Sequence, residues 1–430
     1  MRFWRTNASL CDTAGNLLFY TNGVFIANRN NDTMLNGSGL NPSFYTNSLA
    51  EVGLSAYQSH VFLPGPNESN KYYLFHLFAD TIISTGGAPL KVYYSIIDMD
   101  GNNGLGEVVS KNNILLGDTI YGLNTLTVKH ANGRDWWIIN TKMASNTYCI
   151  SLLTPLGVAL HHLQSIGIPN LPTYTNCIFS PDGNKFINGS AYDRIEVMDF
   201  DRCTGLFDNP QFLPLNHSLD HLVAFSATGR FLYYVVQDTV FQYDFNSSNI
   251  AAKKTVVAIY DGFQTSTTIH TKFYDPILAS NQKIYISSYG TEYFHVINYP
   301  DSAGIACNVV QRGIQLPYYI SGIPHFPNYN LGRLPGSACD TVYSSISELE
   351  QENEVSVFPN PSLTGIFNFR FLDKSEQVKN LYVTDVTGRI IYVLPESSNE
   401  LNLSNTADGI YFYRAKTNKE KIYNGKIIIQ

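Results

Sequence analysis

CIFSPDGNKF at residues 177–186 is the clearest copy of a repeated unit, and residues 222–231 repeat it as LVAFSATGRF. Each copy reads as an apolar strand, a turn that contains glycine, and the start of a second strand. A third strand is expected at residues 194–200 after the first copy and at residues 240–245 after the second. Because no helical pattern separates these strands, the sequence predicts antiparallel meanders.

Units of this kind recur at a spacing of roughly 40 to 50 residues, which is the period of propeller blades. Six units begin near Leu10, Tyr57, Leu126, Tyr174, Leu222 and Phe273. A seventh, partial blade is expected at residues 323–334, completed by strands from the N-terminus, because a closed ring leaves no exposed sheet edge. The sequence therefore predicts an all-β chain in which residues 1–340 form a β-propeller-like domain with seven blades and a truncated first part.

Composition and charge narrow the classes of partner. Aromatic residues make up 13% of the chain and charged residues 15%, a composition that suits short strands better than helices. The net charge is −7 and no lysine–arginine cluster occurs, which argues against nucleic-acid and anionic-membrane partners. No apolar run approaches the roughly 20 residues of a membrane-spanning helix, so no transmembrane segment is predicted.

The last part of the chain reads as a separate small β-domain. It opens with VSVFPNPS at residues 355–362 and continues through short alternating runs that turn residues separate. The expected strands are residues 367–371, 381–385, 390–393, 410–415 and 426–429. We predict a small immunoglobulin-like β-sandwich over residues 355–430. The polar and acidic residues 341–354 are predicted to be an interdomain linker.

Several signatures of this segment occur together in the order of a known family. They are a Phe-Pro-Asn-Pro opening, a Thr-Gly pair, an Asp-x-x-Gly-Arg centre, a Gly-Ile-Tyr-Phe strand and a basic-aliphatic end. The segment resembles the C-terminal sorting domain of type IX secretion cargo, in its type A form. The matching positions are Pro359, Asn360, Pro361, Gly365, Asp385, Gly388, Arg389, Gly409 and Tyr411. An unrelated immunoglobulin-like adhesive module is the alternative interpretation.

This resemblance implies a destination and a partner. Such cargo is exported by the type IX secretion machinery of a gram-negative bacterium, and it is secreted or held at the outer-membrane surface. Residues 1–7 lack the apolar core of a secretory signal. We therefore expect a signal peptide and a further strand upstream of Met1, and an imperfectly closed ring with an exposed edge near residues 3–10.

The region before the linker carries a second resemblance. Residues 12–23, 130–137, 201–205 and 336–340 are similar to signatures of a propeller-type domain found in many uncharacterised type IX cargo proteins. The resemblance implies a fold, an additional strand before the first residue of this chain, and no established catalytic activity.

The densest polar and aromatic cluster is HANGRDWW at residues 130–137. Its candidate ligand-binding residues are His130, Arg134, Trp136 and Trp137. In a binding interpretation, the two aromatic rings stack on a sugar and the charged groups bind its hydroxyls. In a structural interpretation, residues 132–133 form a hairpin turn, the next two residues pair, and the consecutive tryptophans point to opposite faces of a strand. The structural interpretation is favoured.

No sequence motif predicts a metal, a cofactor or a catalytic centre. Residues 98–104 superficially resemble a calcium loop, but Asn103 and Val109 stand at the sixth and twelfth positions, where such a loop has glycine and glutamate, so a surface turn is preferred. His161 and His162 are expected to face solvent rather than to bind a metal. The 6 cysteines form no C-x-x-C pair. Most are expected to be buried thiols, and Cys307 with Cys339 is the disulfide that we favour.

The function predicted from the sequence is binding rather than catalysis. The propeller is expected to recognise a glycan or a protein ligand outside the cell. The alternative is an extracellular polysaccharide hydrolase or lyase, because paired carboxylates that come from distant blades leave no local motif. A scaffold without a specific ligand is the third interpretation. No G-x-S-x-G or H-E-x-x-H motif supports hydrolysis.

Overall fold

The computed structural model describes most of residues 1–430. The exceptions are residues 84–85, 118–120, 170–175, 190–193, 216–221, 251–253, 321, 341–354, 387–388 and 395–397. The chain divides into two compact units, Met1–Thr341 and Val342–Gln430, which are called the propeller unit and the C-terminal unit. The predicted linker, residues 341–354, lies outside the described residues.

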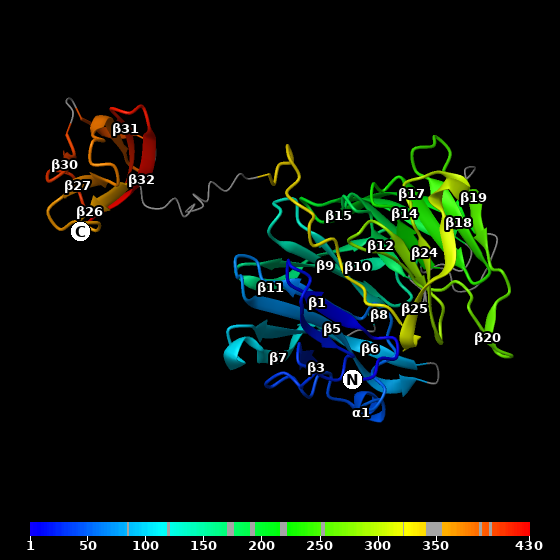
Figure 1. Ribbon diagram of the computed structural model, residues 1–430. Coiled ribbons are helices and arrows are strands. Elements are labelled where there is room, and N and C mark those ends of the chain that lie inside the picture. The colour runs from blue at the N-terminus through cyan, green and yellow to red at the C-terminus, as the bar shows by residue number, and fades with distance from the viewer. Residues whose placement is uncertain are drawn as a thin grey trace. The chain divides into compact units, whose positions relative to one another are not determined.

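The propeller unit is built from small antiparallel sheets that follow one another along the chain (Figure 1). The first sheet has three strands, β1 (Ala8–Cys11), β2 (Leu17–Thr21) and β3 (Ile26–Asn28). Five four-stranded sheets follow, and in each one the strands are ordered as they occur in the sequence. The first strand of every sheet is therefore an edge strand.

The four-stranded sheets have the following bounds. The second holds β4 (His60–Pro64), β5 (Lys71–Ile83), β6 (Gly86–Asp98) and β7 (Glu107–Leu116), and the third holds β8 (Tyr121–Lys129), β9 (Trp136–Lys142), β10 (Thr147–Thr154) and β11 (Gly157–Ser165). The fourth holds β12 (Cys177–Phe179), β13 (Lys185–Asn188), β14 (Arg194–Asp201) and β15 (Leu206–Pro214), and the fifth holds β16 (Leu222–Phe225), β17 (Phe231–Val236), β18 (Thr239–Asp244) and β19 (Lys254–Ile259). The sixth holds β22 (Pro276–Leu278), β23 (Ile284–Ser287), β24 (Thr291–Ile297) and β25 (Val309–Ile320).

Few elements lie outside these sheets in the described part of the propeller unit. They are the hairpin β20 (Gln264–Ser266) and β21 (Ile269–His270), the short helix α1 (Phe44–Ser48), and the 3₁₀ turns Asn102–Gly104 and Gly304–Cys307. The prediction of an all-β, propeller-like domain is confirmed.

Apolar side chains fill the spaces between consecutive sheets. Phe19 of the first sheet packs with Phe62 of the second, and Phe75 of the second packs in a cluster with Trp136 of the third. Similar clusters join the third sheet to the fourth, the fourth to the fifth, and the fifth to the sixth. Burial of these side chains between neighbouring sheets is the main force that holds the unit together.

The sixth sheet and the first are held together by a different kind of contact. Among the described residues, no apolar cluster spans it. Gly322 instead packs against the backbone of Trp4 and Arg5, and the Arg5 guanidinium lies over the Tyr289 ring at 5.6 Å. The N-terminal residues thus close the ring with loop contacts rather than with a paired strand.

The structure corrects the predicted number of blades. In the described residues the propeller unit has six sheets of three or four strands besides the two-stranded hairpin β20–β21, and residues 323–334 contain no strand. This segment includes Pro324 and Pro327, which lack the N–H group that a ladder needs. Residues 322–334, called the strap, instead lie as an irregular extended segment along the first strands of other sheets (Figure 1).

The C-terminal unit is a two-sheet sandwich, as predicted. One sheet holds β26 (Val355–Phe358), β27 (Ile366–Phe371) and β30 (Glu400–Asn402). The other holds β29 (Ile390–Val393), β28 (Val378–Thr384), β31 (Gly409–Thr417) and β32 (Ile422–Ile429), in that order. A single core of side chains from both sheets, which includes Phe367, Phe369 and Val383, lies between them.

Candidate functional site

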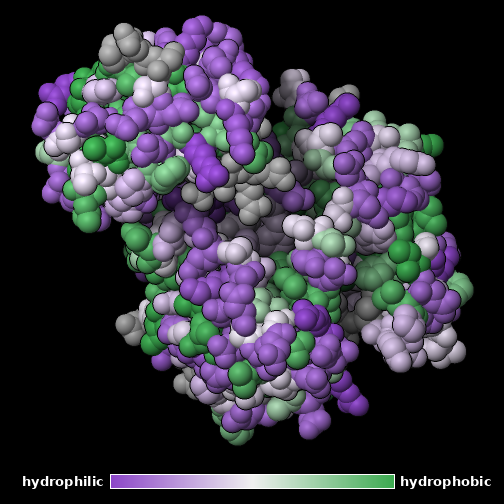
Figure 2. Space-filling view, turned by 60° about the vertical axis from the view of Figure 1, so that its left-hand side comes forward, coloured by the Kyte–Doolittle hydropathy of each residue, from purple (hydrophilic) through white to green (hydrophobic). Residues whose placement is uncertain are grey.

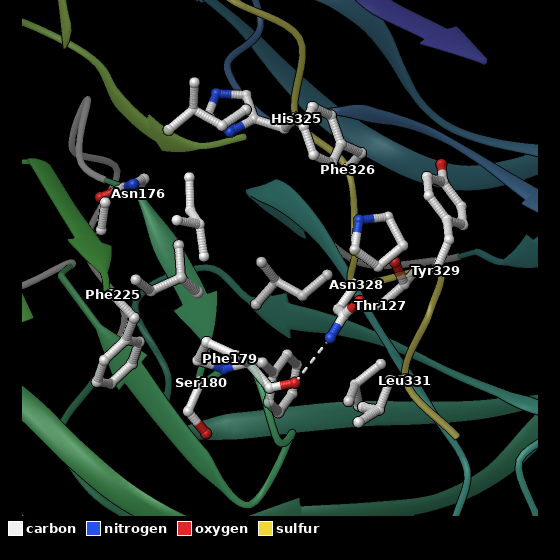
Figure 3. Close-up of a pocket in the computed structure, with 18 of the residues that line it drawn as sticks. Thr127, Asn176, Phe179, Ser180, Phe225, His325, Phe326, Asn328, Tyr329 and Leu331 are labelled. Atoms are coloured by element: carbon white, nitrogen blue, oxygen red, sulfur yellow. Dashed lines mark hydrogen bonds between the residues drawn. The ribbon is translucent and has the colours of Figure 1, made fainter. Parts of the chain in front are cut away.

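The candidate site is a cavity of about 440 Å³ inside the propeller unit (Figure 3). Its walls come from the first strands of five sheets, β4, β8, β12, β16 and β22, and from the strap. Figure 3 shows the strap residues from His325 to Leu331 on one side of the cavity and Asn176 on the other. A cavity of this size lies within the range of about 300–1,000 Å³ that is typical of ligand sites.

Two buried side-chain amides join first strands at the end of the cavity where β12 and β16 begin. Gln58 donates to the Cys177 carbonyl and accepts from the Cys177 N–H, each at 3.0 Å. Asn176 makes the same pair of bonds with the Val223 backbone, each at 2.8 Å. Each amide therefore occupies the position that a backbone amide of a neighbouring strand would take.

The strap is held in place by side chains along its length. Lys129 Nζ donates to the Tyr329 carbonyl at 3.1 Å, and the Tyr329 hydroxyl donates to the Phe62 carbonyl at 2.7 Å. Asn328 donates to the Pro181 carbonyl at 2.9 Å, which is the dashed line in Figure 3. These bonds fix the strap against three different sheets, so one wall of the cavity is as well defined as the others.

Arg202 binds the strap at the point where it leaves the cavity. Its buried guanidinium donates to the carbonyls of Lys129, His130, Asp182 and Gly332 at 2.5–3.3 Å. One of these carbonyls lies at the end of β8, two lie in turns of the third and fourth sheets, and one belongs to the strap. Because a buried guanidinium needs its donors satisfied, this side chain links the strap to both sheets.

The structure also corrects the predicted disulfide. Cys339 is bonded to Cys203, next to Arg202, and the two Cα atoms are 5.4 Å apart. Cys307 is a buried thiol in the core between the fifth and sixth sheets, where burial raises its pKa. The segment that follows the strap is therefore joined to the turn after β14 and not to the sixth sheet, and the spacing of the cysteines in the sequence did not indicate this pairing.

The ionisable groups around the cavity are mostly neutral. No aspartate or glutamate occurs among the described residues that line it. Burial lowers the pKa of His60 to about 3 and that of His325 to about 4, so both imidazoles are uncharged at neutral pH. His60 is held by Ser59 and Asn41, and His325 Nδ1 lies 3.2 Å from the Gln58 amide nitrogen.

One buried carboxyl lies just outside the lining. Asp275 directly precedes β22, and burial raises its pKa to about 6, although the Tyr57 hydroxyl and the Arg5 charge partly oppose that rise. The Tyr57 ring packs edge-on against His325, with 5.0 Å between ring centroids. Asp275 and Tyr57 therefore lie between the contact of the sixth and first sheets and the first residues of the strap.

The cluster predicted from residues 130–137 lies outside the cavity wall. Trp136 and Trp137 are each 1% exposed, and they pack into two different inter-sheet cores, as strand alternation predicts. Arg134 pairs with Asp135 at 2.7 Å. His130 donates to the Cys203 carbonyl at 3.1 Å, and the Trp137 indole donates to the Arg202 carbonyl at 2.8 Å. This arrangement supports the structural interpretation, in which the cluster supports the turn that anchors the strap.

Sequence reasoning missed the residues that line the cavity. They come from five sheets and the strap, and no local motif marks them. In the described residues, no group of three or more His, Cys, Asp and Glu side chains is arranged to hold a metal ion. Figure 2 shows hydrophobic residues dispersed among hydrophilic ones on the face in view. This face is therefore a weaker candidate for a binding site than the cavity is.

The predicted sorting residues have mainly structural roles in the C-terminal unit. Asn360, between Pro359 and Pro361, donates to the Lys426 carbonyl and accepts from the Ile428 N–H of β32. Gly365 has a φ of +72°, and a Cβ there would lie 2.8 Å from the Leu403 backbone. 

The remaining sorting residues lie near strand ends. Arg389 pairs with Asp385 across a turn at 3.0 Å. Tyr411, two residues after Gly409, donates to the Ala407 carbonyl at 2.7 Å. Gly388 lies outside the described residues. The described residues of the motif therefore make contacts within the sandwich itself.

Comparison with known families identifies the C-terminal unit. Residues 356–430 match the secretion system C-terminal sorting domain. The unit is thus a sorting domain, and the protein is type IX cargo that is exported to the cell surface or secreted. Engagement of the secretion machinery follows from that tail. None of the described helices has the length and apolar character to cross a membrane.

Comparison with solved structures returns propeller-like proteins of low identity. Virginiamycin B lyase from Staphylococcus aureus is 11% identical, with 74% of this chain and 87% of that chain covered and a TM-score of 0.41. Regucalcin, a calcium-binding protein from Agrobacterium tumefaciens, is 12% identical, with 76% and 95% covered and a TM-score of 0.38. A gluconolactonase from Xanthomonas campestris is 12% identical, with 67% and 84% covered and a TM-score of 0.36. These likenesses carry no information on activity. No curated protein matches the sequence.

Proposed function

We propose that the propeller unit is an extracellular ligand-binding domain whose binding site is the cavity beside the strap. The observation that carries the proposal is the construction of the cavity. Five first strands and a strap fixed by Arg202 and a disulfide enclose it, which is a preorganised arrangement. The sorting domain delivers this binding unit to the outside of the cell.

The lining supports binding better than it supports polysaccharide cleavage. Hydrolysis of a glycosidic bond generally uses two carboxyl groups, about 5–10 Å apart, on either side of the scissile bond. The described lining has none, and the Tyr329 hydroxyl is committed to the Phe62 carbonyl. A hydrolase or lyase built on this cavity would therefore need acid and base groups from elsewhere.

The experiment that tests the proposal measures binding and cleavage on the same sample. The full chain is applied to a glycan array and to a library of displayed peptides, and release of reducing sugar from polysaccharides is assayed in parallel. We expect saturable binding without release of reducing sugar. Steady release of reducing sugar by the wild-type chain would contradict the proposal and favour the enzyme alternative.

A further inference from the structure

One wall of the cavity is itself an extended peptide, the strap. The strap is bound through the backbone carbonyls of Tyr329 and Gly332 and through the side chains of Asn328 and Tyr329. It carries prolines and aromatic residues and no carboxylate between residues 322 and 334, and its one arginine, Arg333, pairs with Asp340 and lies outside the cavity lining. The walls of this channel are therefore suited to an extended, uncharged segment of chain.

The free edges of the first strands accept amide groups. β12 and β16 each pair with a neighbour on one side only. On the other side, the amides of Gln58 and Asn176 form paired donor and acceptor bonds with the backbone of Cys177 and Val223. A carboxamide and a peptide group have the same donor and acceptor geometry, so these contacts resemble the addition of a strand to a sheet edge.

The polar side chains of the lining are largely committed to bonds within the protein. Gln58, Asn176, Lys129, Asn328 and Tyr329 all bind backbone groups of the propeller unit or the strap. The remaining lining is dominated by apolar side chains, among them Val61, Leu126, Val128, Ile178, Ile277 and Leu278. A sugar would bury many hydroxyls against such a surface with few partners, which is unfavourable.

We propose that the cavity binds a short, extended, apolar segment of a partner protein, which lies alongside the strap. This inference rests on the proposed function and names the ligand class of the same site. Backbone groups of the segment bond to the edges of β12 and β16 beyond Cys177 and Val223, whose own backbone groups already bind side-chain amides. Its apolar side chains fill the space between β12, β22 and the strap. The strap itself supplies one side of the site.

The test uses two matched alanine variants of the full chain. Ala227 lines the cavity and is partly exposed, so Ala227→Trp fills the site from its edge. Ala159 lies on the outer strand β11 and is exposed, so Ala159→Trp is the control. Ala279→Trp, at another partly exposed lining residue, replaces Ala227→Trp if that variant does not fold. Thermal melting establishes that each variant is folded.

Linear peptides selected from a display library, and a panel of neutral oligosaccharides, are the probes. We expect selected peptides to be apolar, to bind the wild type and Ala159→Trp equally, and to bind Ala227→Trp at least tenfold more weakly. Oligosaccharide binding that Ala227→Trp abolishes, without any such peptide, overturns the ligand class but leaves the proposed function standing. If no probe is sensitive to Ala227→Trp, both proposals are wrong.

Discussion

In both units of this chain the recognisable sequence motifs hold structural residues. The units differ in whether those motifs also mark the functional site. In the C-terminal unit, Asn360 and Gly365 belong to the sorting signature and also hold the sandwich together. In the propeller unit, the signature around Trp136 and Trp137 is structural too, yet the cavity lies elsewhere. In both units, therefore, the motif residues have structural roles. Only in the sorting domain does the motif also identify the function, which is export.

The largest expected effect tests the structural role of the tryptophans. Trp137→Ala should lower the free energy of unfolding of the propeller unit by about 3–5 kcal/mol, because a buried indole is lost and a cavity remains. Trp136→Ala should act similarly. Leu156→Ala, at a fully exposed residue, is the control, and melting curves measure all three. A Trp137→Ala protein that melts normally but loses ligand binding would move the binding site to this cluster.

Removal of the disulfide tests the anchoring of the strap. The bond joins residues 136 positions apart, so Cys203→Ser combined with Cys339→Ser should cost about 2–5 kcal/mol of propeller stability. The sorting domain has no cysteine, and its melting should not change. Cys11→Ser, at an exposed free thiol, is the control. Disulfide mapping by mass spectrometry that joins Cys307 to Cys339 would contradict this arrangement.

The buried Asp275 predicts an unusual pH dependence of stability. Its pKa rises from 3.8 to about 6 on folding, so the folded state binds the proton more tightly than the unfolded state. Below pH 3.8 the carboxyl is protonated in both states and does not lower the free energy of unfolding. Between pH 3.8 and 6 its burial lowers that free energy progressively, by about 3 kcal/mol in total. Asp275→Asn should stabilise the propeller unit at pH 7 and not at pH 3.5.

The control for this titration is Asp208→Asn, at an exposed position. Denaturant unfolding at several pH values measures both variants. Equal stability of the wild type and Asp275→Asn at every pH would show that this carboxyl is not held in a buried environment.

The smallest expected effect concerns the sorting motif. Asn360→Ala removes two hydrogen bonds to β32, at 2.8 and 2.9 Å, and should lower sorting-domain stability by about 1 kcal/mol because the site is exposed. The propeller should be unaffected. Leu363→Ala, at an 82% exposed side chain in the same loop, is the control. A drop in propeller melting after Asn360→Ala would contradict the independence of the two units.

The regular parts of the fold could be predicted from the sequence because they rest on local patterns. The repeated units at residues 177–186 and 222–231 predict the first two strands of the fourth and fifth sheets, and the third strands β14 and β18 occur where they were expected. Apolar alternation and turn residues act over a few positions, so a single sequence contains them. The same holds for the sorting domain.

The strap, the disulfide and the cavity could not be predicted for the opposite reason. Bonds that position the strap connect residues 130 to 267 positions apart, such as Arg202 to Gly332 and Tyr329 to Phe62. The strap resembles a weak strand in sequence, but Pro324 and Pro327 lack the N–H group that a ladder needs, and among the described residues the strap pairs with no strand. The cavity depends on where five first strands meet, which no local pattern records.

The most direct test of the account is deletion of residues 355–430 from a version of the chain that carries an inner-membrane signal peptide. Surface labelling of the producing cells and melting of the purified protein are measured together. We expect surface protein to be lost, the truncated chain to accumulate in the periplasm, and the propeller unit to melt at its original temperature. Normal surface levels of the truncated chain would contradict the role of the sorting domain in export. An unfolded propeller unit would contradict its folding as a domain separate from the sorting domain.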